Sequence, residues 1–131
     1  MRVFTFIVLP VLVCLVFSGC QKGVERCAVE GTVTFQGKPI DNANVSIRPE
    51  AGPDAGAITD ANGYFKIPKN EGPMPGNVQI MVEKIIKTKE KNETNIEYEV
   101  FTPGLPQDVQ GKTKPFTLKK GTNKIDLNLD L

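Results

Sequence analysis

The sequence contains no histidine and no tryptophan, and it has only three cysteines. Without histidine, the chain lacks the commonest general base and the commonest nitrogen ligand of metal ions. Without tryptophan, it lacks the best stacking platform for sugars and cations. These absences argue against an enzyme, and we expect no catalytic residue, no metal site and no cofactor.

The first 19 residues have the composition of a signal peptide. A positive charge at Arg2 precedes an almost wholly apolar run, residues 3–17, which is too short to span a bilayer well. The run ends in Phe17-Ser18-Gly19-Cys20, which resembles the lipobox of bacterial lipoproteins, with Phe17 where that motif usually has Leu. The alternatives are a plain secretory signal and an uncleaved anchor helix.

The lipobox resemblance implies that residues 1–19 are cleaved off and that Cys20 is lipidated, for example with palmitate. Two or more acyl chains are sufficient for stable attachment to a membrane. Residues 20–26 would then be a short lipidated tether, and residues 27–131 would be exported to the bacterial cell envelope and held on a membrane. We expect this membrane to be reached through Cys20 and not through a spanning helix.

Charge and cysteine usage are both informative once residues 1–19 are set aside. Arg2 is the one charged residue among them, so 15 basic side chains remain beside 15 acidic ones. A balanced surface gives no argument for a nucleic acid partner. Cys14 leaves with the leader and Cys20 carries lipid, so Cys27 has no partner within the chain. We expect Cys27 to be a small buried hydrophobe at the start of the first strand, and an intermolecular disulfide is the alternative.

The remaining chain alternates apolar and polar residues with a period of two, which is typical of strands with one buried face. Glycine and proline separate the alternating segments, and no helical periodicity is present. The pattern therefore predicts one all-β domain, an antiparallel β-sandwich of about seven short strands. The alternating segments are residues 29–35, 43–48, 57–59, 64–67, 77–83, 96–100, 116–118 and 125–131.

Three connections carry specific predictions. Residues 36–39 contain glycine and proline and predict a turn after the first strand. Asp60-Ala61-Asn62-Gly63 predicts a tight hairpin between residues 57–59 and 64–67. Residues 84–95 interleave lysine and glutamate, which we interpret as the solvated tip of a hairpin and not as a phosphate or lipid-headgroup site.

Four motifs in order resemble the carboxypeptidase regulatory-like domain. The resemblance covers essentially all of residues 27–131 and implies a seven-stranded Greek-key sandwich of the transthyretin (prealbumin) type. It implies no catalysis, because the family's domain is an accessory to a protease that is absent here, and transthyretin-like hydroxyisourate hydrolases rely on histidines. The motifs are Val29-Glu30-Gly31-Thr32-Val33 with Gly37-Lys38-Pro39-Ile40, Ala43-Asn44-Val45, Thr59-Asp60-Ala61-Asn62-Gly63-Tyr64-Phe65 and Pro75-Gly76-Asn77-Val78.

The acidic loop residues invite two further hypotheses. Asp60 to Gly63 is similar to the start of a calcium loop, but the glycine comes two residues early, and the turn chemistry explains all four residues. An acid/base pair is a second hypothesis for the loop carboxylates Glu50, Asp54 and Asp60. Carboxylates in glycine- and proline-rich loops are usually just solvated, however. We prefer the structural interpretation in both cases.

Two functions remain open from the sequence. The first is a lipid-anchored, non-catalytic structural or protein-interaction module of the cell envelope, with an envelope protein as partner. The second is a carbohydrate- or small-ligand-binding module that uses Tyr64, Tyr98 or Phe101 at one end of the sandwich. Neither a ligand nor a partner is identified by any motif.

Overall fold

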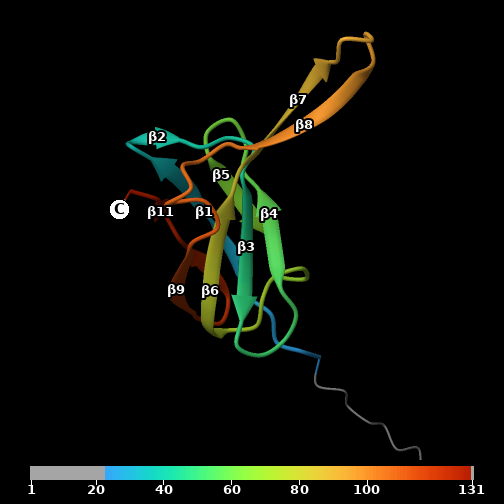
Figure 1. The fold of residues 1–131 in the computed structure, drawn as a ribbon. Coiled ribbons are helices and arrows are strands. Elements are labelled where there is room, and N and C mark those ends of the chain that lie inside the picture. The colour runs from blue at the N-terminus through green and yellow to red at the C-terminus, as the bar shows by residue number, and fades with distance from the viewer. Residues whose placement is uncertain (1–22, 131) are drawn as a thin grey trace, which may run out of the picture.

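The computed structural model of the protein describes residues 23–130. Residues 1–19 and Cys20, on which the predicted leader and lipid depend, lie outside this range. All regular structure within residues 23–130 is β-strand, and the strands are arranged as a sandwich with a projecting two-stranded ribbon (Figure 1). The predicted all-β sandwich is therefore confirmed. Since these residues contain no helix, none of them forms a membrane-spanning helix.

The first sheet is built around β1 (Ala28–Phe35). β5 (Tyr64–Ile67) and the short β2 (Lys38–Pro39) pair with β1 in antiparallel orientation. β10 (Thr122–Lys124) and β11 (Leu127–Asn128) pair with β1 in parallel orientation. The sequence predicted one continuous last strand over residues 125–131, whereas the structure divides the C-terminal segment between two short strands along β1.

The second sheet has the order β4-β3-β6-β9 and is antiparallel throughout. Its strands are β4 (Ala55–Ile58), β3 (Asn44–Pro49), β6 (Gly76–Glu83) and β9 (Thr113–Leu118). β4 and β9 are the edges of this sheet, and Pro115 interrupts the donors along β9.

The core lies between the two sheets and follows the alternation of the sequence. Alternate residues of β1, β3 and β6 are buried, and their neighbours face solvent. Cys27 is fully buried, as predicted, and burial raises the pKa of its thiol despite an opposing backbone hydrogen bond. The buried apolar residues are Cys27, Val29, Val33, Ala43, Val45, Ile47, Ala55, Phe65, Ile67, Val78, Ile80, Val82, Leu105, Val109, Leu118, Ile125, Leu127 and Leu129.

Gly31 explains how the C-terminal segment lies against β1. A Cβ atom at this position would stand 1.6 Å from the carbonyl oxygen of Ile125. The Ile125 amide in turn donates to the carbonyl of Glu30 at 2.8 Å, so the two backbones are in direct contact. A side chain at position 31 would force them apart, which is why glycine interrupts the buried face of β1.

The two predicted turns have different outcomes. Gln36 and Gly37 both have positive φ, 51° and 72°, and they join β1 to β2 as a two-residue hairpin turn. Asp60 to Gly63 also makes a tight turn, in which the Gly63 amide donates to the Asp60 carbonyl at 2.9 Å. However, β4 pairs with β3 and β5 pairs with β1, so this turn carries the chain from one sheet to the other. The predicted hairpin pairing of these two strands is wrong, because local turn chemistry does not specify which sheet receives the next strand.

The third sheet is the ribbon, which consists of β7 (Ile85–Lys91) and β8 (Glu97–Pro103). These strands pair only with each other and extend away from the sandwich (Figure 1). The hairpin predicted around residues 84–95 is confirmed, but the sequence interpretation treated residues 85–91 as a polar tip and missed that they form a strand.

Candidate interaction surface

The ribbon has two faces, and solvent reaches both. Opposite residues in the pairing register share a face, so Ile86 and Tyr98 lie on one face while Ile85 and Phe101 lie on the other. Every residue of β7 is exposed, and every residue of β8 except Val100 is exposed. An isolated two-stranded hairpin is of marginal stability in water, so the interactions along the ribbon itself matter.

Charged side chains surround Phe101 on its face of the ribbon. The Lys87 ammonium lies 2.8 Å from a Glu99 carboxylate oxygen and 5.7 Å from the centroid of the Phe101 ring. Lys91 and Glu97 form a second, longer pair at 3.8 Å. Exposed pairs of this kind contribute little to stability, typically about 0.2–1 kcal/mol each. The lysines and glutamates that made this segment look like a plain solvated tip therefore also surround an exposed aromatic ring.

The opposite face carries Tyr98, whose hydroxyl donates to the Glu90 carboxylate at 3.2 Å. This hydrogen bond raises the pKa of Tyr98 above its ordinary value. Tyr98 nevertheless remains 45% exposed, and Phe101 on the other face is 62% exposed. The two aromatic rings therefore cannot act together as one flat platform.

The tip of the ribbon is organised by Asn92. Its side-chain oxygen accepts hydrogen bonds from the amides of Thr94 and Ile96 and from the Thr94 hydroxyl. Asn95 adopts a positive φ of 65°, and its amide donates to the Asn92 carbonyl at 2.9 Å. These bonds fix the tip as a compact turn.

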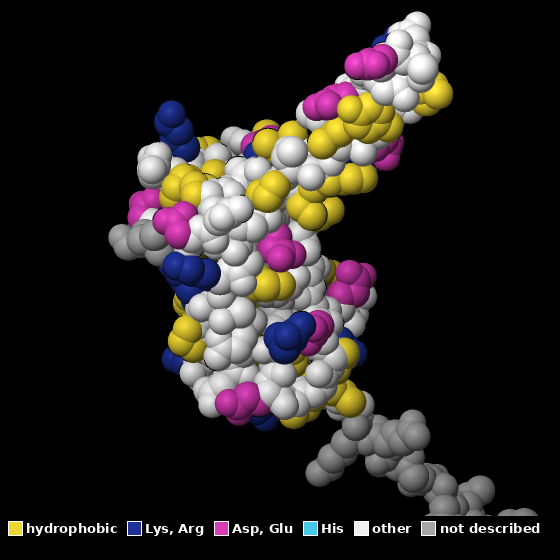
Figure 2. Space-filling view, viewed as in Figure 1, with side chains coloured by type: hydrophobic (Ala, Val, Ile, Leu, Met, Phe, Trp, Pro, Cys, Tyr) yellow, Lys and Arg dark blue, Asp and Glu magenta, His cyan; other side chains and the backbone are white. Residues whose placement is uncertain are grey.

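The base of the ribbon joins the sandwich through Lys84. The Lys84 ammonium lies 2.7 Å from the Asp41 carboxylate, and this hydrogen bond lowers the pKa of Asp41. The Gln110 side chain accepts from the Lys84 amide and donates to the Lys84 carbonyl. Beside this junction lies a small hollow lined by Asn42, Asn44, Ile58, Glu83 and Ile85, and hydrophobic side chains are visible around the ribbon base in Figure 2.

The other aromatic candidate, Tyr64, lies on the sandwich. Its hydroxyl donates to Glu30 at 3.0 Å, and this bond raises the pKa of Tyr64. Of the three aromatic residues proposed from the sequence, the structure places Tyr98 and Phe101 on opposite faces of the ribbon and Tyr64 on β5. They are not brought together into one site.

The acidic loop residues each have a structural partner. The Asp60 carboxylate accepts from the amides of Asn62 and Tyr64 at 2.8 and 3.0 Å, as expected for a side chain that caps a turn. Asp54 pairs with Arg48 at 3.2 Å, and Glu50 accepts from the Asn77 side chain at 3.3 Å. Asp54 and Asp60 also lie beyond opposite ends of β4, so they do not form a pair. Within residues 23–130, no group of three or more His, Cys, Asp or Glu side chains is placed to hold a metal ion.

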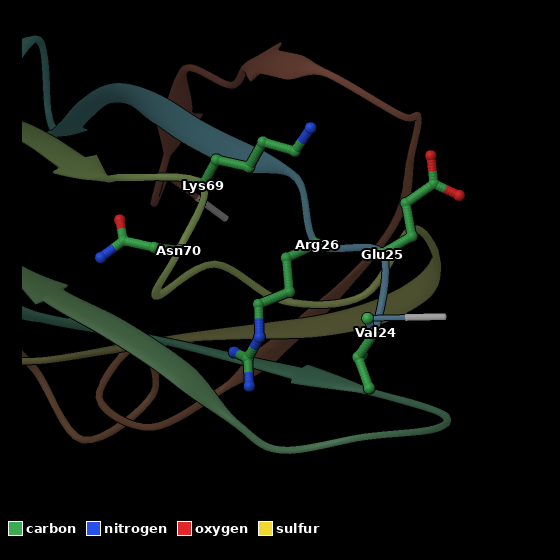
Figure 3. Close-up of a pocket in the computed structure, with 6 residues that line it drawn as sticks. Val24, Glu25, Arg26, Lys69 and Asn70 are labelled. Carbon is green, nitrogen blue, oxygen red and sulfur yellow. The ribbon is translucent and has the colours of Figure 1, made fainter. Parts of the chain in front are cut away.

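A second hollow lies where the N-terminal segment enters the sandwich, at the end of the molecule opposite the ribbon. It is lined by residues 23–26 together with Lys69 and Asn70 from the loop after β5 (Figure 3). The exposed Val24 side chain lies at its margin, and Arg26 donates to the Gly72 carbonyl at 2.9 Å. The hollow is an open depression and brings together no pair of catalytic groups.

The sequence interpretation missed the apolar residues of the ribbon other than Tyr98 and Phe101. Ile85, Ile86 and Ile96 are all exposed, although isoleucine is usually a core residue. A signal was present, because the apolar pair Ile85-Ile86 immediately follows the predicted strand over residues 77–83. The high lysine content of the segment concealed it.

Comparison with known proteins gives one family match and several distant structural likenesses. The profile of a domain of unknown function, DUF6795, matches residues 29–119. No curated protein matches the sequence.

Two solved structures resemble the fold. One is a 9R-lipoxygenase from Cyanothece PCC8801, with a TM-score of 0.43 and 16% identity over 82% of this chain and 16% of that chain. The other is a DUF3823 family protein from Parabacteroides merdae ATCC 43184, with a TM-score of 0.47 and 13% identity over 80% of this chain and 46% of that chain. The matched region therefore spans less than half of either protein.

Proposed function

The chain belongs to the DUF6795 family, whose function is unknown, and we propose that it is a non-catalytic module that binds another protein of the cell envelope through the ribbon β7–β8. The proposal includes a lipid anchor on Cys20 and a location at the bacterial cell envelope. It keeps the finer resemblance to lipoproteins with a carboxypeptidase regulatory-like domain as part of the same hypothesis.

One observation carries the proposal, namely where the exposed hydrophobic side chains are located. Seven large hydrophobic side chains are exposed within residues 23–130, and Val24 and Ile58 are the two outside the ribbon hairpin. The other five, Ile85, Ile86, Ile96, Tyr98 and Phe101, all lie on β7, β8 or their connecting turn. Exposed apolar residues that gather on one element, rimmed by charge, are typical of a protein-interaction surface.

The chemistry of the ribbon favours a protein as partner. Aromatic residues are enriched at the positions that dominate binding energy in protein interfaces, and Tyr98 and Phe101 offer one such anchor on each face. The outer edges of β7 and β8 have no strand beside them within residues 23–130, so they also offer backbone donors and acceptors to an extended segment. We therefore expect a partner with a complementary apolar surface and an available strand or groove.

Photo-crosslinking in living cells tests this function directly. We would place p-benzoylphenylalanine at Phe101 or Tyr98 of the full chain and compare it with the same group at Lys66, an exposed position on β5. We expect discrete protein adducts from both ribbon positions and none from position 66. Adducts of equal yield from all three positions, or no protein adduct from the ribbon, would contradict the proposal.

The lipid anchor requires its own measurement. Labelled palmitate should be incorporated into the wild-type chain and not into a Cys20→Ser variant. If the wild-type chain takes up no label, the anchor is disproved while ribbon binding can still be judged from the crosslinks.

A carbohydrate- or small-ligand-binding module is the second candidate, and the exposure of Tyr98 and Phe101 supports it. Such rings can stack on sugars, although each stands alone on its face of the ribbon. A glycan array probed with the soluble domain would distinguish the candidates. Saccharide binding that is abolished by Tyr98→Ala would favour this second function over a protein partner.

A further inference from the structure

The N-terminal end of the described chain and the ribbon lie at opposite ends of the molecule (Figure 1). The loop before β6 meets the N-terminal segment at Pro73, whose carbonyl accepts from the Cys27 amide. β6 begins three residues later at Gly76 and runs along the sandwich toward Lys84, where the ribbon starts. We call the surface around residues 23–26, Lys69, Lys119 and Lys120 the tether end. One nearly continuous extended path therefore connects the tether end to the ribbon.

The N-terminal segment contacts the sandwich from Glu25 onward. The Glu25 carboxylate lies 2.8 Å from the Lys120 ammonium. The Cys27 amide donates to the Pro73 carbonyl at 3.0 Å, and the Ala28 amide donates to the Gly121 carbonyl at 2.8 Å. The last two residues of the predicted tether, Glu25 and Arg26, thus already belong to the folded domain.

The chain between Cys20 and these contacts is short. Five residue steps separate Cys20 from Glu25, and a fully extended chain of that length spans at most about 18 Å. A lipid on Cys20 would therefore keep the tether end close to the membrane surface, whatever conformation the intervening residues adopt. The ribbon lies at the other end of the molecule from this point of attachment (Figure 1).

We infer that the tether end rests against the headgroups of the anchoring membrane and that the ribbon is presented away from it. This inference rests on the lipid anchor of the proposed function. Val24 is an apolar side chain, 58% exposed, beside the hollow lined by Arg26 and Lys69 (Figure 3). Lys69 and Lys119 are exposed and form no ion pair with any acidic group of residues 23–130, so they are available to anionic headgroups.

The length of the extended path determines what kind of partner the ribbon can meet. From Gly76 to Lys91 the chain makes 15 residue steps, which correspond to roughly 50 Å at the rise of a β-strand. The kink visible where the ribbon leaves the sandwich shortens this distance somewhat (Figure 1). The partner surface therefore lies well clear of the bilayer, on a protein in the aqueous compartment and not within the lipid phase beside the anchor.

Energy transfer to a labelled membrane tests this orientation. The lipidated full chain would be reconstituted into vesicles of phosphatidylethanolamine and phosphatidylglycerol that carry acceptor-labelled headgroups in the outer leaflet. A donor dye would be attached to a single new cysteine at Asn70→Cys, Lys38→Cys or Thr94→Cys, and Lys69 is kept because it belongs to the proposed contact surface. These positions represent the tether end, the far end of the sandwich on β2, and the ribbon tip, and the native Cys27 is fully buried.

We expect transfer to be strongest from position 70, weaker from 38 and weakest from 94. Equal transfer from 70 and 94, or the reverse order, would overturn the inference. Cys20→Ser should abolish transfer from all three positions, and unchanged order and strength without the lipid would refute the role of the anchor. The expected order without crosslinks at Phe101 would keep the orientation and refute ribbon binding, so the two failures are distinguishable.

Discussion

The sandwich and the ribbon are built from the same period-two pattern but use it differently. In the sandwich, one face of each strand packs on the opposite sheet, and Phe65, Ile47 and Val45 lose nearly all contact with solvent. In the ribbon, both faces of both strands lie in solvent, and the register is maintained by hydrogen bonds, two ion pairs and the capped tip. The comparison teaches that burial stabilises this fold, whereas the ribbon is a surface feature whose apolar residues contribute little to folding.

The sharpest test of this difference exchanges one phenylalanine in each region for alanine. Phe65 is 1% exposed, so Phe65→Ala should lower the free energy of unfolding by about 3–5 kcal/mol. Phe101 is 62% exposed, so Phe101→Ala should change the same quantity by less than about 0.5 kcal/mol. Urea unfolding of the soluble domain measures both, and a similar loss in the two variants would break the comparison.

A second pair of substitutions removes one threonine hydroxyl group from the sandwich and one from the ribbon. The buried Thr59 hydroxyl accepts from the Ala43 amide at 2.8 Å and donates to the Ile40 carbonyl at 2.7 Å. Thr59→Val leaves the Ala43 amide and the Ile40 carbonyl without this partner, and it should lower the free energy of unfolding by about 1–3 kcal/mol. Thr102→Val on the ribbon removes an exposed bond of 3.5 Å and should have no measurable effect on unfolding. Urea midpoints of the two variants decide the matter, and an unaffected Thr59→Val protein would refute the assigned role of this hydroxyl.

Removing the ribbon tests whether the sandwich depends on it. Residues 86–102 can be replaced by Asn-Gly, because Ile85 and Pro103 already stand opposite each other and a two-residue loop can join them. We expect the sandwich to retain its stability within about 1 kcal/mol, since β7 and β8 pair with no other strand. Circular dichroism and urea unfolding would show this, and a collapse of cooperative unfolding would mean that the ribbon is part of the folding unit.

The smallest expected difference concerns alkaline pH, for which the chain offers one tyrosine in each region and no others. The hydrogen bond from Tyr64 to Glu30 raises the pKa of Tyr64. The contribution of this bond to the free energy of unfolding is therefore fully present below the ordinary tyrosine pKa near 10, and it is lost as pH rises through the raised pKa. The hydrogen bond to Glu90 raises the pKa of Tyr98 in the same way, but both of these residues belong to the ribbon.

Thermal unfolding between pH 9 and pH 11.5 would separate these two contributions. Tyr64→Phe should lose less stability over this range than the wild-type protein, because it lacks the group whose ionisation breaks the bond to Glu30. Tyr98→Phe should follow the wild-type curve, since ionisation in the ribbon leaves the sandwich intact. Identical curves for wild type and Tyr64→Phe would show that this bond does not contribute to folding.

Much of the sandwich could be predicted from local pattern. Alternation identified the buried sides of β1, β3 and β6 and the burial of Cys27. Glycine with proline identified the turn after β1, and asparagine with glycine identified the turn at residues 60–63. The same reasoning failed where pairing is long-range. It predicted a hairpin between β4 and β5, although each pairs in a different sheet, and it did not foresee that the C-terminal segment pairs in parallel with β1.

The ribbon shows a second limit of prediction from the sequence pattern. Alternation in β8 was recognised, but β7 was not, because lysine at alternate positions conceals a strand that buries neither face. The exposure of a side chain depends on what lies beside it in the folded protein, and the sequence does not state that Ile85, Ile86 and Phe101 remain exposed. The sequence named Tyr98 and Phe101 as possible binding residues, but only the tertiary structure shows that the exposed hydrophobic residues gather on the ribbon.

By itself the sequence determined the all-β class, the faces of the main strands and the short distance from Cys20 to the domain, because period-two burial, turn chemistry and chain length are local properties. Tertiary structure decided which strands pair, the crossing from β4 to β5, the parallel contacts of β1 and the exposure of the ribbon. It also decided that the ribbon and the tether end lie at opposite ends. Those features depend on backbone hydrogen bonds and packing between residues far apart in the chain, which no local pattern encodes.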